Sequence, residues 1–156
     1  MKLRAAQEQD IDAITTILTD NSVEVDKELY LKQIKHNKHF YVLDDEDKVL
    51  GFLLAFDKKG LSDPKLKNDP KIKHLLKDKS WEFLYIKEII VKKSEKGKRL
   101  EIILLSAFLD DVADKPVYAV VGEKDPLETF LSFLNFQESE TFELEGQPCL
   151  IFEWEK

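Results

Sequence analysis

A group of cationic side chains stands between an apolar run and a stretch of helical periodicity. Its members are Lys92, Lys93, Lys96, Lys98 and Arg99, with Gly97 among them. Residues 83–91 before it are aromatic or β-branched with few interruptions, which favours a centrally placed strand. The first amides of a helix, together with the helix dipole, attract an anion. If a helix begins directly after these cations, their position indicates a phosphate-bearing ligand.

The residues that follow the cations predict such a helix and a second strand. Apolar side chains recur at helical spacing at Leu100, Ile103, Leu104, Ala107 and Phe108. Pro116 then opens another apolar run at residues 117–121. Two strands joined by a helix are most simply parallel with a right-handed crossover, so the helix starts beside the carboxyl end of the first strand. A solvated, lysine-rich turn is the alternative interpretation of the same cations.

Length and composition limit the class of protein. A chain of 156 residues with 43% hydrophobic and 35% charged residues predicts a single domain over residues 1–156 that can bury one core. No apolar run reaches the roughly 18 residues that span a bilayer, and the first residues lack a signal-peptide core. We therefore expect a cytoplasmic protein with no membrane partner. The single cysteine, Cys149, excludes an intrachain disulfide and a multi-cysteine zinc site.

The net charge and the positions of the histidines limit the ligands and partners that the chain is expected to bind. The formal net charge is -7, from 24 basic and 31 acidic residues, so the surface as a whole repels nucleic acid. An anion must be held by a local patch, and an amine-bearing partner suits the rest. His36, His39 and His74 show neither metal-ligand spacing nor an acidic partner at a telling interval, so we expect surface histidines and no metal site.

The remaining segments predict further strands and helices. We expect a short strand at residues 2–6, a helix capped by Asp10 that ends near Asn21, and a second helix at 26–35. Two hairpins are expected, one from residues 39–43 and 48–56 and one from 139–144 and 149–154, with a helix between 125 and Asn135. Gly51 indicates a bulge or a close backbone approach. Residues 58–80 read as a polar insertion with a short helix at 70–76.

The predicted class is α+β (mixed α/β), with the order β-α-α-β-β-β-α-β-α-β-β and a mixed, mostly antiparallel sheet flanked by helices. In this order the chain resembles the GNAT superfamily of acyl-CoA-dependent N-acyltransferases over nearly its whole length. Three stretches carry the likeness: MKLRAAQEQDIDAI, IKEIIVKKSEKGKRLEIILLSAF and KDPLETFLSFLNF. The second is similar to the family's central strand and pyrophosphate loop, usually written V-x-P-x-x-R-G-x-G-x-G-x-x-L.

The loop matches this motif in part. Val91 takes the valine, Lys96 the arginine and Gly97 the first glycine, whereas Arg99 and Glu101 stand at the second and third glycines. Glycine at these positions lets the backbone approach a pyrophosphate closely, so the motif is degenerate here. The resemblance implies that acetyl-CoA is bound by Ile89, Ile90, Val91, Lys93, Lys96, Gly97, Lys98, Arg99, Leu100 and Glu101.

The same resemblance implies a catalytic role for Glu88. The family's central strand often supplies a glutamate that takes a proton from the attacking amine, and Glu88 lies three residues before Val91. A backbone N–H near Ile90 or Val91 would hold the oxyanion. Leu131 stands where the family often has a tyrosine that protonates the leaving thiolate, and leucine cannot do so. An exposed strand residue is the alternative interpretation of Glu88.

Three functions follow, in order of preference. The first is an N-acetyltransferase that moves an acetyl group from acetyl-CoA to a primary amine of a small molecule or protein. The second is a catalytically degenerate GNAT-like binding or regulatory domain that acts through a partner protein, as Arg99, Glu101 and Leu131 suggest. The third is a structural subunit that pairs through an edge strand of the last hairpin. Family members are often dimers, so a homodimer is also expected.

Overall fold

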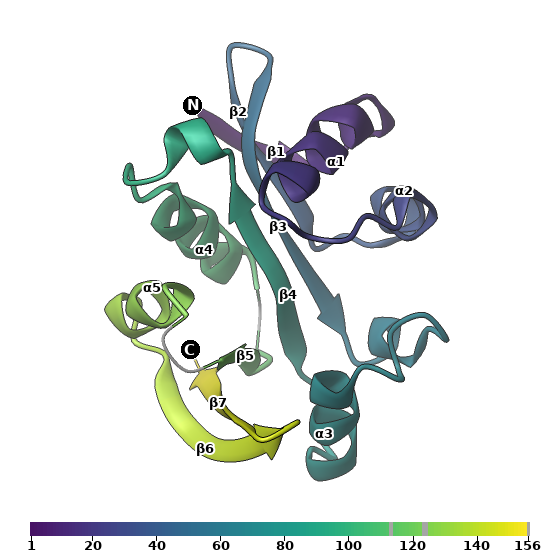
Figure 1. The fold of residues 1–156 in the computed structure, drawn as a ribbon, viewed down its shortest axis with the longest axis vertical. Helices are drawn as coiled ribbons and strands as arrows, with labels where there is room; N and C mark the ends of the chain where they lie inside the picture. The colour runs from purple at the N-terminus through teal and green to yellow at the C-terminus, as the bar shows by residue number, and fades with distance from the viewer. Residues whose placement is uncertain (113, 123–124, 156) are drawn as a thin grey trace. The chain divides into compact units, whose positions relative to one another are not determined.

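The computed structural model describes residues 1–112, 114–122 and 125–155 (Figure 1). The chain divides into two compact units, which we treat separately. Unit 1 comprises residues 1–55 and 88–111, and unit 2 comprises residues 56–87 and 112–156. Each unit is therefore assembled from two separate stretches of the chain. The single domain over residues 1–156 stays a prediction.

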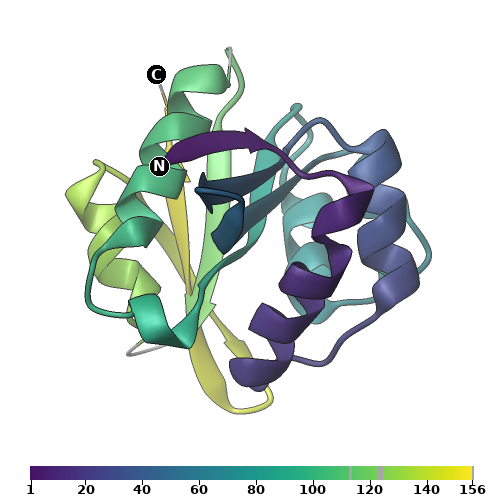
Figure 2. The same cartoon turned by 90° about the horizontal axis from the view of Figure 1, so that it is seen from above.

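Unit 1 is a small sheet with helices on both faces. Its strands are β1 (Lys2–Ala5), β2 (Phe40–Asp45), most of β3 (Lys48–Asp57) and the end of β4 (Leu84–Val91), and its helices are α1 (Ile11–Asp20), α2 (Lys27–His36) and α4 (Leu100–Asp111). Both β1 and β3 pair with β2 in antiparallel fashion. Figure 2 shows α1 and α2 on one side of these strands and α4 on the other. The sheet is thus covered on both faces, which explains the nearly continuous burial of β2 and β3.

The sheet of unit 1 contains a register shift beside Gly51. Leu43 is paired with Gly51, but its neighbour Asp44 is paired with Val49, so Leu50 is an extra residue in β3. A Cβ atom at Gly51 would lie 2.9 Å from Ile90 O and 2.9 Å from Val91 Cγ1. The bulge and the close backbone approach that the sequence offered as alternatives at this glycine are therefore both present.

Unit 2 carries the polar insertion and the last hairpin. Its elements are α3 (Pro70–Asp78), the start of β4, β5 (Val117–Gly122), α5 (Leu127–Phe133), β6 (Gln137–Leu144) and β7 (Gln147–Trp154). The start of β4 runs parallel to β5, with Leu84 paired with Val117. Strand β7 is antiparallel to both β5 and β6. The helix predicted at residues 70–76 is confirmed and continues for two further residues.

The seven strands follow the hydrogen-bonded order β1-β2-β3-β4-β5-β7-β6. The mixed, mostly antiparallel sheet and the predicted order of elements are confirmed, and the α+β class with them. Strand β4 belongs to both units: its first residues pair with β5 in unit 2, and Lys92 directly after its last residue donates its backbone N–H to Leu50 O of unit 1 at 2.7 Å. Among the described residues, no helix is long and apolar enough to cross a membrane.

Two local expectations are corrected. Asp10 precedes α1 as predicted, but its carboxylate accepts hydrogen bonds from Arg4 and from the backbone N–H of Gln7 instead of capping α1. In α4 the buried face includes Leu105 and Leu109, while Ile103 is 42% exposed. This helix has apolar residues nearly all round, so the spacing alone could not determine which face is buried.

Candidate functional site

The loop between β4 and α4 has two residues in the left-handed region. A short 3-10 turn, η3 (Lys93–Glu95), follows β4, and φ is +90° at Gly97 and +59° at Arg99. Arg99 occupies the position of the second glycine in the loop motif. The loop therefore has a left-handed residue at that position even though its side chain is that of arginine. The side chain that follows, Leu100, is 3% exposed and anchors the first turn of α4 in the core of unit 1.

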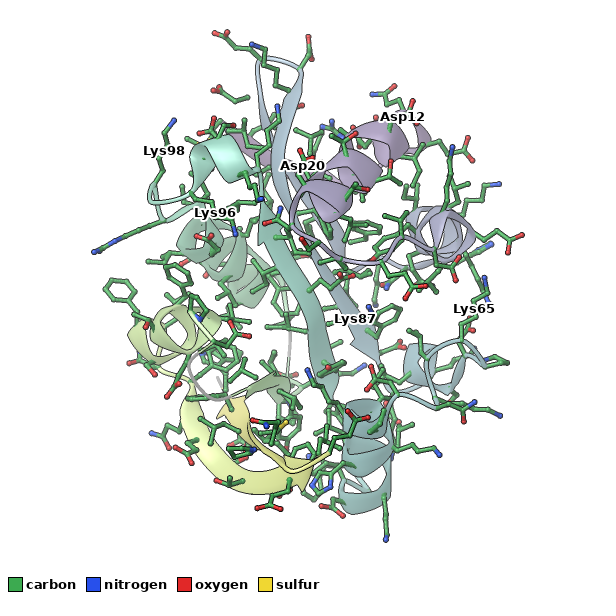
Figure 3. All side chains as sticks on the ribbon, in the orientation of Figure 1. Asp12, Asp20, Lys65, Lys87, Lys96 and Lys98 are labelled. Atoms are coloured by element: carbon green, nitrogen blue, oxygen red, sulfur yellow. The ribbon has the colours of Figure 1, made fainter. Side chains whose placement is uncertain are left out.

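The predicted cations surround the start of α4. Lys93, Lys96, Lys98 and Arg99 are all exposed. Figure 3 shows Lys96 beside the first turn of α4 and Lys98 projecting outward from the loop. Lys98 Nζ lies 2.7 Å from Glu95 Oε2, so part of its charge is balanced locally. Helix α4 has 12 residues, and the first amides of such a helix lack acceptors within the helix.

This loop fits a phosphate in its donor set. Exposed ammonium groups and the positive end of a helix dipole lie at one place, and both attract an anion. Glu101 is half-buried in the first turn of α4, and its carboxylate opposes them. The side chains of Arg99 and Glu101 at the second and third glycine positions therefore bring one positive and one negative charge to this place.

The end of β4 is held by side chain and backbone contacts that the sequence did not indicate. Asn21, at the C-terminus of α1, donates from Nδ2 to Val91 O at 3.2 Å and to Ile17 O at 2.8 Å. One amide group thus joins the last turn of α1 to the last residue of β4. Ile89 and Ile90 are half-buried, whereas Val91 is 1% exposed.

Glu88 is a half-buried residue of β4 with a buried tyrosine as hydrogen-bond donor. The hydroxyl of Tyr30, on α2, donates to Glu88 Oε1. Burial raises the pKa of Tyr30, and the Glu88 carboxylate raises it further. Tyr30 is only 2% exposed, and its ring packs against Phe40 and Phe52. A hydroxyl that stays protonated and whose ring is fixed can orient the carboxylate of Glu88.

The sequence predicted a role for Glu88 but did not indicate Tyr30 as its hydrogen-bond partner. The buried residues of α2 are Leu29, Tyr30 and Gln33, and only the first of these is an aliphatic side chain. A tyrosine next to a buried leucine was the available signal, because a buried phenol requires a hydrogen-bond partner. The partner itself depends on which strand lies beside α2, and that could not be obtained from spacing along the chain.

The surroundings of His74 and His39 differ from those that the sequence predicted. His74 Nε2 contacts both Asp78 and Glu140, so it has acidic partners, one of them four residues later on the same helix. The hydrogen bond with His74 holds the pKa of Glu140 below its usual range. His39, expected at the surface, is half-buried, and its ring meets Phe108 edge-on. His36 is exposed, and the Cys149 thiol is buried.

Known proteins match this chain in structure but not in sequence. No protein-family model matches the sequence, and no curated protein matches it. Solved structures do match. A GNAT-family acetyltransferase from Bacillus cereus ATCC 10987 has a TM-score of 0.72 and 18% identity, covering 99% of this chain and 96% of that one. The ribosomal-protein-alanine N-acetyltransferase from Brucella melitensis has a TM-score of 0.72 and 14% identity, covering 100% of both chains.

A third match was solved with a ligand. Naa50 from Arabidopsis thaliana, in complex with the bisubstrate analogue CoA-Ac-MVNAL, has a TM-score of 0.71 and 14% identity, covering 99% of this chain and 98% of that one. The chain has the GNAT fold. At these identities the likeness concerns the backbone, so the role of each residue in this GNAT fold must be argued from its own surroundings.

Two residues of α5 and its end bear on the expected GNAT motifs. Leu131 is fully buried in unit 2. Its side chain therefore belongs to the core at the position where a tyrosine acid was considered. Asn135 has a φ of +68°, a left-handed conformation that asparagine tolerates and that commonly ends a helix.

Proposed function

We propose that the protein is an N-acetyltransferase that transfers an acetyl group from acetyl-CoA to a primary amine. The observation that carries the proposal is the succession of Glu88, the end of β4, and an exposed cationic loop at the first turn of α4. A candidate base and a candidate phosphate site thus lie on consecutive segments of one unit. The GNAT fold supports the same reaction class.

Each part of this segment has a proposed task. Lys93, Lys96 and Arg99 attract the phosphates of acetyl-CoA, together with the amides of Gly97 to Glu101. Lys92 donates its N–H toward β3, and backbone groups alternate along a strand, so the N–H of Val91 points to the opposite edge of β4. Of the two residues considered for the oxyanion, Val91 is therefore the better donor.

Glu88 is the proposed general base. An amine must be neutral to attack a thioester, so the Glu88 carboxylate takes its proton, directly or through one water. The C–N bond then forms, the C–S bond breaks, and CoA leaves as a thiolate. Tyr30 is a positioning residue, because it contacts the carboxylate of Glu88 and not the reacting atoms. Leu131 cannot donate a proton to the thiolate, which can leave without one.

The acceptor is proposed only as a class. The net charge of -7 favours a cationic amine over an anionic acceptor. Two of the matched structures are a ribosomal-protein-alanine N-acetyltransferase and a protein bound to a CoA-peptide analogue, which supports a protein or peptide amine beside a small-molecule amine. A cytoplasmic location and a homodimer remain predictions.

A second candidate is a binding domain with the GNAT fold but without catalysis. Glu101 in the first turn of α4 and the buried Leu131 favour it, because one opposes phosphate binding and the other removes an acid. Such a domain would act through a partner protein.

Binding and chemistry are tested separately. Acetyl-CoA about a hundredfold above its Kd should raise the Tm of the full chain by about 5–10 °C, because a ligand that binds only the folded state stabilises it. No rise at millimolar acetyl-CoA would end both the transferase proposal and a CoA-binding version of the second candidate. A rise without CoA release, over a broad panel of amines and peptides, would favour the binding domain.

The role of Glu88 is tested by Glu88→Gln. This variant should keep the acetyl-CoA-induced rise in Tm and lose about a hundredfold or more in kcat, since general bases contribute roughly 100- to 10,000-fold. Tyr30→Phe should reduce kcat by less and leave the KM for acetyl-CoA unchanged. Unchanged kcat in Glu88→Gln would show that another group takes the proton.

A further inference from the structure

Unit 2 contains a cluster of three side chains that can bind a metal ion. His74 and Asp78 lie one turn apart on α3, and Glu140 lies on β6. His74 Nε2 is 3.1 Å from Asp78 Oδ2 and also contacts Glu140 Oε1. One ligand atom from each of the three residues lies within 4.8 Å of the other two. None of them is used by the proposed acetyl transfer.

A single linear hydrogen bond does not account for this convergence, although a bifurcated one could join the same atoms. A single ring nitrogen carries at most one hydrogen, yet carboxylates from two different elements approach the same atom. The two carboxylates also repel each other. A divalent cation at this point would bind all three groups, and one imidazole with two carboxylates is a donor set that Zn²⁺ and its neighbours accept.

One of the three distances between donor atoms is close to that which a metal requires, and the others lie within 4.8 Å. With ligand bonds of about 2.0–2.2 Å, the donor atoms of a tetrahedral zinc site lie about 3.3–3.6 Å apart. The distance between His74 Nε2 and Asp78 Oδ2 is already 3.1 Å. The contact between His74 and Glu140 must widen slightly, and a strand side chain such as that of Glu140 can do this by rotation about its own bonds.

The surroundings hold the ligands in place and leave them accessible. The ring of His74 is stacked on Phe142, with centroids 4.1 Å apart and an interplanar angle of 2°. Lys79 Nζ lies 3.4 Å from the other oxygen of Glu140, so it orients that carboxylate and balances part of its charge. The side chains of His74, Asp78 and Glu140 are 26%, 38% and 31% exposed, so an ion can enter from solvent.

We propose that the chain binds one divalent first-row transition metal ion, with Zn²⁺ as the probe, through His74 Nε2 and the carboxylates of Asp78 and Glu140. Water completes the coordination. The ion joins α3, the helix of the polar insertion at 58–80, to β6 of the last hairpin. Within unit 2, the insertion is thereby linked to the last hairpin through metal–ligand bonds, in addition to the apolar contacts of the core. This site does not depend on the proposed transferase activity.

Calorimetric titration of the metal-free full chain with Zn²⁺ tests the proposal. We expect one Zn²⁺ per chain and, at about a hundredfold excess over Kd, a rise in Tm of about 5 °C. Asp78→Asn and Glu140→Gln preserve side-chain volume, and each should weaken binding by at least about tenfold, the lower bound for groups that only support a metal ligand. His74→Ala should abolish it. His36→Ala, which removes an exposed histidine from unit 1, is the matched control and should bind as the native chain does.

Co²⁺ gives a direct readout of the ligands. Its visible absorption bands should appear with the native chain and be lost in Glu140→Gln, with circular dichroism confirming that the variant is folded. The proposal is overturned if Zn²⁺ fails to bind, or if the three ligand variants bind it as well as the native chain and His36→Ala do. In either case the cluster is an ion pair only.

Discussion

Arg99 has a backbone conformation that is unfavourable for a residue with a side chain. Its φ of +59° lies where residues with a Cβ atom are strained by about 1–2 kcal/mol. We compare Arg99→Gly with Arg99→Ala, because both remove the same charge and only alanine keeps the strain. The extra conformational entropy that glycine loses on folding offsets part of the relieved strain. The glycine variant should therefore be more stable than the alanine variant by about 0.5–1 kcal/mol, or about 2 °C in Tm. Equal melting temperatures would mean that the loop relaxes to another conformation.

The ion pair between Arg4 and Asp10 predicts a pH dependence. Arg4 donates to both oxygens of Asp10, at 2.7 and 2.8 Å, and its Nε donates to Asp44 at 2.9 Å. Burial tends to raise the pKa of Asp10, but hydrogen bonds from Arg4 and from the Gln7 N–H hold it below its usual 3.8. Because the pKa is lower in the folded state, the stabilisation is present above pH 3.8 and is lost as the pH falls through the folded-state pKa.

Asp10→Asn should therefore destabilise the protein most near neutral pH. We expect a loss of about 2 kcal/mol there, below the usual 3–5 for a broken buried pair, because Arg4 keeps Asp44. The difference from the native chain should shrink below about pH 4, as measured by urea unfolding across pH. Glu24→Gln, in an exposed loop, is the control and should stay within about 0.5 kcal/mol. A difference that does not change with pH would contradict the argument.

Residues differ in how far their roles could be predicted from the sequence. The loop lysines and Glu88 could be placed on a loop and a strand from the sequence, because that placement requires only the local pattern of one strand and the loop after it. Tyr30 could not be assigned to Glu88, and Asn21 could not be assigned to Val91, because each pair joins segments about 60 to 70 positions apart. His74 was misjudged although Asp78 stands four residues later, a spacing that places both on one face of a helix.

The pairing of β3 and β4 depends on Gly51. An added Cβ atom would lie 2.9 Å from Ile90 O and 2.9 Å from Val91 Cγ1. The first is a backbone atom and the second belongs to a short, branched side chain, so neither can easily move away. Gly51→Ala should therefore cost about 2 kcal/mol, as overpacking of a core does. Gly122→Ala in β5 is the matched control: nothing lies within 4 Å of the added atom, and its effect should stay within about 0.5 kcal/mol. Denaturant unfolding measures both, and similar values for the two variants would contradict the close approach.

Elements were predicted well where the periodic signal was strong. Helix α1 ends at Asp20, next to the expected Asn21, and α3 begins at the expected Pro70. Strand β6 begins at Gln137, two residues before the expected start, because its exposed residues carry little apolar signal. The buried face of α4 was missed for the opposite reason, since an almost wholly apolar helix has no distinct polar side.

At the scale of the whole chain, element order predicted the fold where individual motifs were weak. The glycines of the loop are partly replaced and no family model matches, yet the chain forms the predicted mixed, mostly antiparallel sheet. The sheet order depends on hydrophobic pattern and connection lengths, which many sequences satisfy. The division into two units that share β4 was not foreseen, because it depends on contacts between distant segments and not on any change of composition.

The net charge of the chain and the cationic loop at α4 have opposite effects on the binding of acetyl-CoA, which is a polyanion. A chain with a net charge of -7 repels acetyl-CoA at long range, so binding must depend on the few cations at α4. Lys93→Ala/Lys96→Ala should weaken acetyl-CoA binding about thirtyfold, at about 1 kcal/mol for each lost contact. Lys38→Ala/Lys59→Ala removes the same charge from exposed residues outside the loop, and should change binding by less than about twofold, since exposed charges that do not contact the ligand are largely screened in 0.1 M salt. Calorimetric titration at that salt concentration compares the pairs, and equal losses would show that net charge governs binding and that the loop is only a solvated turn.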